Sequence, residues 1–229
     1  MSHLRSLLRK IIASAPIIFY SPTFACILQG GMYIPIGIFA FLYFPWNPLV
    51  WLSETRWLVT HLIFIPYYLR WLKDVVETLS TVFVVVGLAI FLIAFWQLTK
   101  RKTEFLTTGL YSVVRHPQYL GIMLSTLGFT LRSWKPMAVI AWLTLAFGYL
   151  LLASSEEKRL QEKHGAKFLS YKQRVPFILP LLPPGPLNQL PSIMPKSRLK
   201  RHVFLLCIYL LMVILAAMIL KPYVYGNFR

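Results

Sequence analysis

Residues 117–153 read PQYLGIMLSTLGFTLRSWKPMAVIAWLTLAFGYLLLA, and this stretch decides the fold. Two apolar segments, 117–131 and 136–153, are joined by residues 132–135, a link that is too short for anything except an antiparallel helical hairpin. Each segment opens with a proline, a residue that the first turn of a helix tolerates. The stretch therefore predicts two adjacent helices that run back and forth across a membrane.

The composition of the whole chain agrees with a membrane protein. Of its 229 residues, 57% are hydrophobic and 14% are charged, and the apolar residues form long blocks instead of alternating with polar ones. The formal charge of +17 would suggest nucleic acid in a soluble protein. Here the basic residues flank the apolar blocks, as the positive-inside bias of membrane proteins predicts. We therefore expect membrane lipids and no nucleic acid as partners.

Apolar blocks of about membrane length predict the number of spans. They are residues 13–44, 75–98, 117–131, 136–153 and 203–220. Five crossings place every major basic cluster on one side, so we predict an all-α, polytopic transmembrane helix bundle of about five spans. Residues 57–71 contain His61, Pro66 and Arg70, and we expect them to form an interfacial or re-entrant helix.

Residues 155–172 form the one charge-dense, amphiphilic segment. Either Ser154 or Ser155 is the expected N-cap before two acidic residues. The pattern predicts that a separate amphipathic helix begins at this cap and lies in the cytosol.

A proline-rich stretch separates the last apolar block from the rest of the chain. Residues 176–195 contain seven prolines and little periodicity, which is typical of an extended linker. The chain is accordingly divided into an N-terminal transmembrane region (1–99), a core (100–180), and a linker with a terminal transmembrane helix (181–229). The sequence does not indicate an oligomeric state.

A polar cluster lies against the hairpin in residues 106–121, LTTGLYSVVRHPQYLG. Ionisable groups at membrane depth are costly, so they face a cavity or one another and by default mark a site. Because the hairpin returns the chain to the same side, we expect His116 and Tyr119 to face Glu156 and Glu157 across one cavity. Such groups suit a zwitterion, for example an amino acid headgroup.

The rest of the sequence offers no second candidate site. Cys26 and Cys207 lie in apolar runs, with no CxxC motif and no His at metal spacing, so we predict neither a disulfide framework nor a metal site. The aromatic residues within 57–71 are typical of the belt that membrane proteins place at headgroup level. Glu77 lies near the start of a span, where pairing with Lys73 would satisfy it.

Two blocks of the sequence resemble the superfamily of membrane methyltransferases that includes isoprenylcysteine carboxyl methyltransferase and phosphatidylethanolamine methyltransferase. The first block, 106–121, contains Arg-His-Pro-x-Tyr-x-Gly, and the second, 156–180, contains Glu-Glu followed by Leu, Gly, Tyr and Val-Pro. Both blocks occur in the family's order and are separated by an apolar hairpin. Together they cover roughly a third of the chain.

The resemblance implies S-adenosylmethionine as cofactor, a lipophilic methyl acceptor, and an active site on the cytoplasmic side of the membrane. The residues implied to bind the cofactor are Thr103, Glu104, Phe105, Leu106, Tyr111, His116, Pro117, Gln118, Tyr119 and Glu157, and those expected to be catalytic are Glu156 and Arg174. Simpler alternatives exist for two of them. His116 would also serve as a helix-entry residue bonded to backbone, and Arg174 as an anchor at the lipid headgroups.

The acceptor stays open at this stage among a lipid amine and a prenylated or small hydrophobic thiol or carboxylate. The isoprenylcysteine enzymes carry an arginine about one helical turn before the conserved glutamate, whereas this chain has residues 152–154, Leu-Ala-Ser, at that place. This departure favours an amine or a thiol, and we expect the acceptor to enter sideways from the bilayer. Competing functions are an NADPH-dependent enzyme similar to sterol reductases and a non-catalytic membrane scaffold or transporter.

Overall fold

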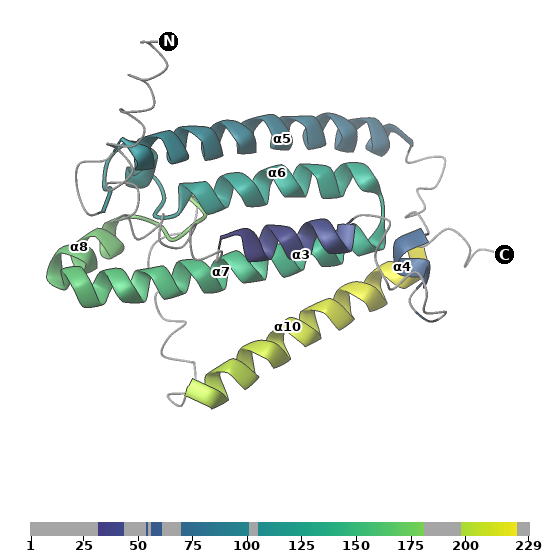
Figure 1. Cartoon of the computed structure of the whole chain (residues 1–229). Coiled ribbons are helices and arrows are strands. Elements are labelled where there is room, and N and C mark those ends of the chain that lie inside the picture. The colour runs from purple at the N-terminus through teal and green to yellow at the C-terminus, as the bar shows by residue number, and fades with distance from the viewer. Residues whose placement is uncertain are drawn as a thin grey trace, which may run out of the picture.

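The computed structural model describes residues 32–43, 54, 56–60, 70–100, 105–180 and 198–223, and within these ranges the regular elements are all helices (Figure 1). They are α3 (Tyr33–Tyr43), α4 (Arg56–Thr60), α5 (Arg70–Thr99), the 3-10 helix η3 (Gly109–Ser112), α6 (Pro117–Ser133), α7 (Pro136–His164), α8 (Ala166–Arg174), α10 (Arg198–Leu220) and the 3-10 helix η5 (Lys221–Tyr223). The predicted all-α fold is confirmed.

The predicted hairpin forms the centre of the bundle. Helices α6 and α7 run antiparallel, and the chain reverses at Trp134, whose φ of 52° lies in the left-handed region that ends many helices. Pro117 and Pro136 occupy the first turns, as expected. Helix α5 packs along α6, while α3, α4 and α10 lie against α7 (Figure 1). The hairpin is thus the part of the bundle against which α3, α4, α5 and α10 pack.

Small residues let α5 and α6 approach each other closely. A Cβ atom built on Gly121 would lie 2.6 Å from the backbone nitrogen of Phe91, and one on Gly87 would lie 2.5 Å from the backbone nitrogen of Ser125. Real side chains do not fit at such distances, so only glycine allows this contact, as is common between membrane helices. The close contact fixes the start of α6, from which the polar cluster projects.

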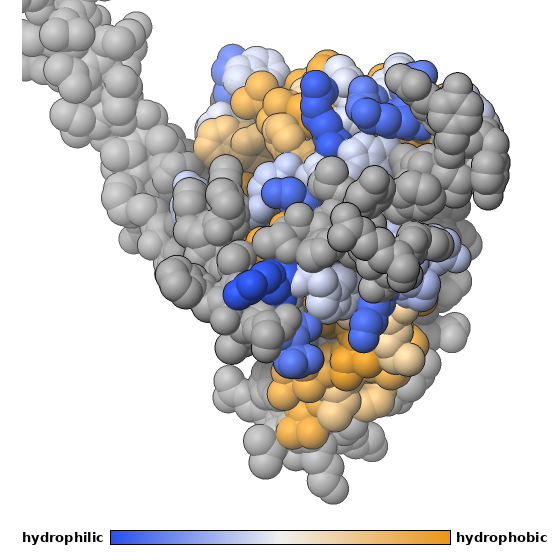
Figure 2. Space-filling view, turned by 90° about the vertical axis from the view of Figure 1, so that its right-hand side faces the viewer, coloured by the Kyte–Doolittle hydropathy of each residue, from blue (hydrophilic) through white to orange (hydrophobic). Residues whose placement is uncertain are grey.

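The described helices are those of a membrane protein. Three of them are long and apolar enough to cross a bilayer, namely Trp71–Thr99, Pro136–His164 and Val203–Tyr223. Hydrophilic residues gather at the end of the bundle where α5 begins and α6 turns into α7, with apolar surface beside them (Figure 2). Such a polar end is expected where helices meet the headgroups.

The count of five spans stays a prediction. Helix α6 has 17 residues, or about 25 Å at 1.5 Å per residue, so it is shorter than the three long spans. Most of the first apolar block, 13–44, lies outside the described residues, as does most of 57–71, of which α4 and the start of α5 are described. The division into three regions is likewise not tested by the fold.

The predicted start of a separate helix at Ser154 or Ser155 is wrong. Helix α7 continues without interruption to His164, and neither serine caps a helix. Their hydroxyl groups donate to the carbonyl oxygens of Leu150 and Leu152 within α7, each at 2.8 Å. The helix ends only at Gly165, with φ of 50°, because the residues before it are mostly good helix formers. The acidic pair therefore belongs to the same rigid helix as the span.

Candidate active site

Segments distant in sequence converge at the end of the bundle where α6 begins and α7 ends. The loop before α6 is tied to the chain around α8 at two points. The Arg115 backbone N–H donates to the carbonyl oxygen of Pro176 at 3.0 Å, and the Tyr171 hydroxyl donates to the carbonyl oxygen of Tyr111 at 2.6 Å. These bonds hold His116, at the N-cap of α6, over the last turns of α7.

Glu157 is the centre of a buried group of charges. Its Oε1 lies 2.6 Å from Nη1 of Arg115 and 3.4 Å from Nε2 of His116, and its Oε2 lies 3.1 Å from Nζ of Lys172. Arg115, His116 and Glu157 are all buried. Burial of a charge is tolerated only with a partner, so these residues must be considered as one unit.

Glu156 lies beside this group and has different partners. One carboxylate oxygen accepts a hydrogen bond from the Tyr119 hydroxyl at 2.9 Å, and the other lies 3.6 Å from Nδ1 of His116. In the described part of the chain, no cation lies as close to Glu156 as Arg115 and Lys172 lie to Glu157. The two neighbouring carboxylates therefore differ in environment, which is the usual way to give two acids different roles.

Two groups of the site outside the spanning helices have shifted pKa values. Burial lowers the pKa of the Arg115 guanidinium, and the Glu157 carboxylate beside it offsets part of this effect. Burial also raises the pKa of the Tyr171 phenol above its ordinary value of 10.0. Tyr171 therefore stays protonated and keeps its hydrogen bond to the loop.

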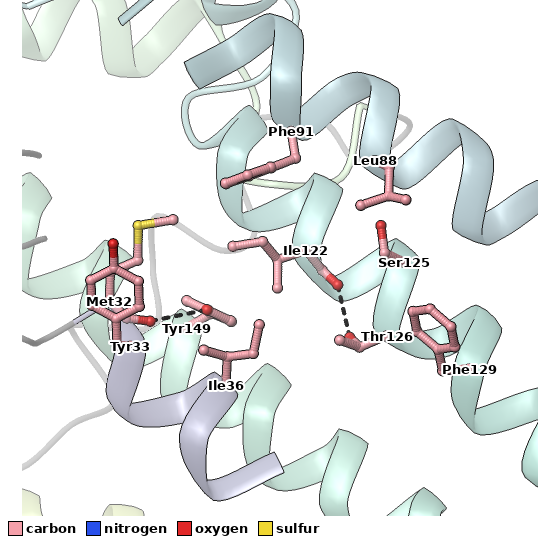
Figure 3. A pocket seen from close by; sticks show the side chains of 10 residues that line it. All are labelled: Met32, Tyr33, Ile36, Leu88, Phe91, Ile122, Ser125, Thr126, Phe129 and Tyr149. Atoms are coloured by element: carbon pink, nitrogen blue, oxygen red, sulfur yellow. Dashed lines mark hydrogen bonds between the residues drawn. The ribbon is translucent and has the colours of Figure 1, made fainter. Parts of the chain in front are cut away.

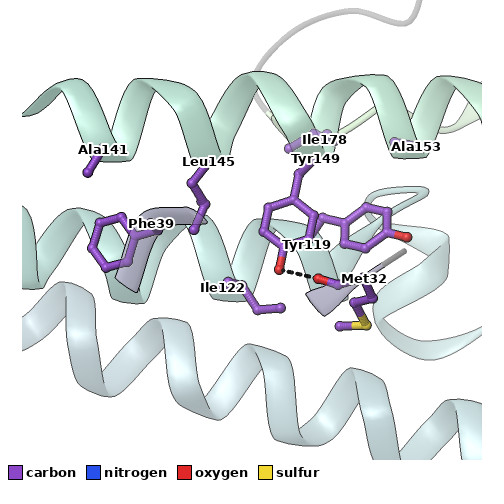
Figure 4. Close-up of a cluster of buried hydrophobic side chains, with 9 residues drawn as sticks. All are labelled: Met32, Phe39, Tyr119, Ile122, Ala141, Leu145, Tyr149, Ala153 and Ile178. Atoms are coloured by element: carbon purple, nitrogen blue, oxygen red, sulfur yellow. Dashed lines mark hydrogen bonds between the residues drawn. The ribbon is translucent and has the colours of Figure 1, made fainter. Parts of the chain in front are cut away.

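A stack of rings connects the polar cluster to the apolar core. The ring of His116 stacks on Tyr119 with centroids 5.6 Å apart, and Tyr119 stacks on Tyr149 at 4.9 Å. Tyr149 is fully buried in the main core cluster, and its hydroxyl donates to the carbonyl oxygen of Met32 at 3.1 Å (Figure 4). Tyr149 in the core is thus connected to Glu156 through Tyr119, on which it stacks.

An apolar pocket of about 220 Å³ lies on the other side of Tyr149, between α3, α5, α6 and α7 (Figure 3). It is lined by Met32, Tyr33, Ile36, Leu88, Phe91, Ile122, Ser125, Thr126, Phe129 and Tyr149. Of the two stacked tyrosines, Tyr149 lines the pocket and Tyr119 donates to Glu156. Among the described residues, no three His, Cys, Asp or Glu side chains are grouped as a metal site requires.

The structure brings most of the predicted site residues together. Tyr111 is buried and donates to Oε1 of Gln118 at 3.0 Å, beside the charged group. Phe105 packs on the rings of Phe168 and Tyr171, and Leu106 packs against a small cluster that includes Tyr111, so both hold the loop in place. Tyr111, Phe105 and Leu106 therefore support the loop before α6. Pro117 is buried in the first turn of α6.

Three predicted residues are not placed in the cluster. Thr103 and Glu104 lie outside the described residues. Arg174 is exposed at the end of α8, where its Nε donates to the carbonyl oxygen of Ser170 at 3.1 Å. A catalytic role for Arg174 stays a prediction without support from its position.

Sequence reasoning missed the roles of Lys172 and Tyr149. Lys172 is one of several lysines in 158–172, and nothing in the local pattern distinguishes it from the others. The sequence did contain an indication for Tyr149, because a hydroxyl in the middle of an apolar span requires a hydrogen-bond partner. Only the folded structure shows that Tyr149 lines the pocket and stacks on Tyr119.

The central segment of the chain matches a known protein family. Residues 75–167 match the phospholipid methyltransferase family, a range that contains most of α5, the hairpin and the start of α8. This confirms the resemblance seen in the sequence. No solved structure gives a significant match.

Individual relatives are methyltransferases of two kinds. A methanethiol S-methyltransferase 2 from Bradyrhizobium diazoefficiens is 31% identical over 165 residues, which are 67% of this chain and 60% of the relative. A methanethiol S-methyltransferase from Crocosphaera subtropica is 29% identical over 147 residues, 62% of this chain and 56% of the relative. The protein-S-isoprenylcysteine O-methyltransferase B of Arabidopsis thaliana is 28% identical over 94 residues, 39% of this chain and 48% of the relative. The matches thus span about half to three fifths of each relative's length.

Proposed function

Because residues 75–167 belong to the phospholipid methyltransferase family, we propose that this protein is an integral membrane methyltransferase that uses S-adenosylmethionine and acts on a lipophilic acceptor. The observation that carries the proposal is the buried polar cluster of His116, Glu156 and Glu157 at the end of apolar helices. A bundle does not need such a cluster for stability, since buried charges are costly even when paired.

The residues of the cluster match the chemistry of S-adenosylmethionine. Its amino acid end carries an ammonium and a carboxylate, which require an acceptor and a cation. Glu156 offers an acceptor without a close lysine or arginine among the described residues, and Arg115 and Lys172 supply positive charge on the other side of Glu157. His116 Nε2 is buried and forms no aligned hydrogen bond within the described part of the chain. A buried nitrogen without a hydrogen-bond partner is a position where a ligand atom can form that bond.

The proposed reaction demands little from the protein beyond alignment. When bound, S-adenosylmethionine supplies a methyl group on a positively charged sulfur, and the acceptor's electron pair forms the new bond as the old bonding pair returns to that sulfur. Glu156 is placed to take a proton from the acceptor, because its carboxylate is held by a neutral hydroxyl instead of a strong cation. The buried site excludes water.

We place the active site on the cytoplasmic side. The cluster end of the bundle carries Lys100, Lys163, Lys167, Lys172 and Arg174, while the opposite end carries Lys73, Arg132 and Lys135 together with the acidic Asp74 and Glu77. The positive-inside bias favours the cytoplasm for the more basic end. A soluble cofactor made in the cytosol would reach the site directly from this side.

The charge balance argues against NADPH. A dinucleotide phosphate carries several negative charges and needs more cations than the single carboxylate of S-adenosylmethionine does. In this site Arg115 and Lys172 both contact Glu157, and Glu156 adds a second negative charge. A scaffold or transporter would need no buried pair of carboxylates beside a histidine, so we rank that function below methyl transfer as well.

Calorimetry on the protein purified in detergent tests the proposal. We expect binding of S-adenosylmethionine and S-adenosylhomocysteine and no binding of NADPH. His116→Ala and Glu156→Gln should each weaken cofactor affinity about tenfold or more, since a charge-assisted hydrogen bond contributes about 1.5–3 kcal/mol. Glu162→Gln is the matched control, because Glu162 lies on the same helix in an exposed pair with Lys158. NADPH binding alone would move the protein to the reductase group.

A further inference from the structure

We infer that Lys172 on α8 binds the carboxylate of the methyl donor, and that Arg115, the other cation in contact with Glu157, does not. The inference rests on the proposed function and deepens it, because it assigns one end of the cofactor to one side chain. It is carried by the surplus of positive charge around Glu157, by the anchoring of Arg115 and by the position and exposure of Lys172.

The charges of the cluster are distributed unequally between its two carboxylates. Glu157 contacts two cations, with Nη1 of Arg115 2.6 Å from its Oε1 and Nζ of Lys172 3.1 Å from its Oε2. One carboxylate balances one cation, so a positive charge is in surplus on this side. Glu156 faces the other nitrogen of His116 and contacts no lysine or arginine among the described residues. A zwitterion with its ammonium toward Glu156 and its carboxylate toward the surplus cation balances both sides.

The protein itself already anchors Arg115. Its side chain is only 2% exposed, its guanidinium carbon lies 5.2 Å from the centre of the Phe177 ring, and its backbone N–H donates to Pro176. A ligand that took the guanidinium for itself would remove the nearest partner of the buried Glu157 carboxylate. Leaving a buried charge without its partner is costly. We therefore assign Arg115 to Glu157 and not to the ligand.

Lys172 has the access and the reach that Arg115 lacks. It follows the buried Phe168 by four residues, so it lies on the same face of α8. Its side chain is 19% exposed, whereas those of Arg115 and Glu157 are 2% and 7% exposed. Its ammonium carries three donors on a flexible stem, and Glu157 is its one ionic partner in the described part of the chain. Lys172 can thus donate to a ligand carboxylate without leaving Glu157.

The first experiment changes the ligand and leaves the protein intact. Calorimetry in detergent would compare S-adenosylhomocysteine with S-adenosyl-3-thiopropylamine, which keeps the nucleoside, the thioether and the ammonium but lacks the carboxylate. One charge-assisted hydrogen bond changes affinity by about tenfold or more. We therefore expect the wild-type protein to bind S-adenosylhomocysteine at least about tenfold more tightly than the amine.

Substitutions assign this preference to one lysine. Lys172→Met should reduce the preference for S-adenosylhomocysteine over the amine to within about twofold, because only the zwitterion has a carboxylate contact to lose. Lys172→Arg keeps a cation and should keep most of the preference. Lys167→Met is the matched control, since Lys167 is exposed on the same helix, and it should leave both affinities unchanged. If Lys172 only tied α8 to Glu157, Lys172→Met would weaken both ligands by the same factor.

A measurement on the wild-type protein covers the case in which Lys172→Met does not fold. Lysines would be acylated with an N-hydroxysuccinimide ester and the rates read by mass spectrometry. Saturating S-adenosylhomocysteine should slow acylation of Lys172 at least about tenfold more than the saturating amine does, the factor expected for one charge-assisted hydrogen bond. The rate at Lys167 should not respond to either ligand. Equal protection of Lys172 by the two ligands would show that they cover it without a contact to the carboxylate.

The outcomes distinguish failure of this inference from failure of the proposed function. If the wild-type protein binds neither S-adenosylmethionine nor S-adenosylhomocysteine, the proposed function fails. If it binds S-adenosylhomocysteine no more tightly than the amine, or if Lys172→Met weakens both ligands equally, the role of Lys172 is overturned and cofactor binding stands. Equal protection of Lys172 from acylation by both ligands would overturn it in the same way.

Discussion

Glu157→Gln should strongly destabilise the protein, because it removes the negative charge at the centre of the buried group. The side chain of Arg115 is 2% exposed and lies 2.6 Å from the Glu157 carboxylate, and Lys172 lies 3.1 Å from its other oxygen. Without that charge, two positive charges remain close together near the start of α6. Removing one partner of a buried ion pair costs about 3–5 kcal/mol, and we expect a loss of stability in this range.

The assay is unfolding by SDS titration in mixed micelles, with the free energy of unfolding compared between variants. Glu162→Gln is the matched control, since it removes the same charge from the same helix. Its pair with Lys158 spans 3.9 Å and Glu162 is 66% exposed, so its loss should cost less than about 1 kcal/mol. Replacing both Arg115 and Glu157 by apolar residues of similar volume should recover much of the lost stability.

A specific result would refute this reasoning. If Glu157→Gln and Glu162→Gln change the free energy of unfolding by the same small amount, Glu157 does not hold the loop and α8 to α7. From the sequence, Glu157 was expected only to bind the cofactor. The structure changes that expectation, since the same carboxylate also pairs with Arg115 and Lys172.

Further predictions concern helix packing and pH. Gly121→Ala should destabilise the protein by about 1–3 kcal/mol in the same SDS assay, because its Cβ would lie 2.6 Å from the Phe91 backbone. Gly37→Ala is the control and should be neutral or slightly stabilising, because no atom lies within 4 Å of its Cβ. Equal effects of the two substitutions would contradict the close contact of α5 and α6. Because burial raises the pKa of the Tyr171 phenol above 10.0, its contribution to stability is present below pH 10 and is lost as the pH rises beyond it. Tyr171→Phe should therefore lose less thermal stability than the wild type between about pH 9 and pH 11, and identical losses would argue that the phenol is not buried.

The sequence predicted the hairpin and the convergence of the two motifs for sound physical reasons. A four-residue link with prolines at both helix starts permits only one arrangement, and a hairpin returns the chain to the same side. Residues 116 and 156–157 were therefore expected to meet, and they do. Local geometry and hydrophobic patterning were sufficient for this step.

Other features could not be predicted because they depend on tertiary packing. Serine is a frequent N-cap, so Ser154 and Ser155 suggested a helix start, but their hydroxyl groups bond within a continuous α7. The choice of Lys172 among neighbouring lysines depends on the direction in which α8 leaves Gly165. The pocket requires four helices to be placed first, so no pattern in one segment reveals it.

The transfer of a radiolabelled methyl group tests the central claim most directly. The purified protein would receive S-adenosylmethionine labelled in its methyl group together with 1-butanethiol, total membrane lipids or a prenylcysteine analogue, each in a separate reaction. We predict label in at least one of these lipophilic acceptors with the wild-type protein and at least about a hundredfold less with His116→Ala, since loss of alignment by small displacements costs about that factor. The absence of label in all three acceptors, from a protein that binds NADPH instead of S-adenosylmethionine, would contradict the assignment.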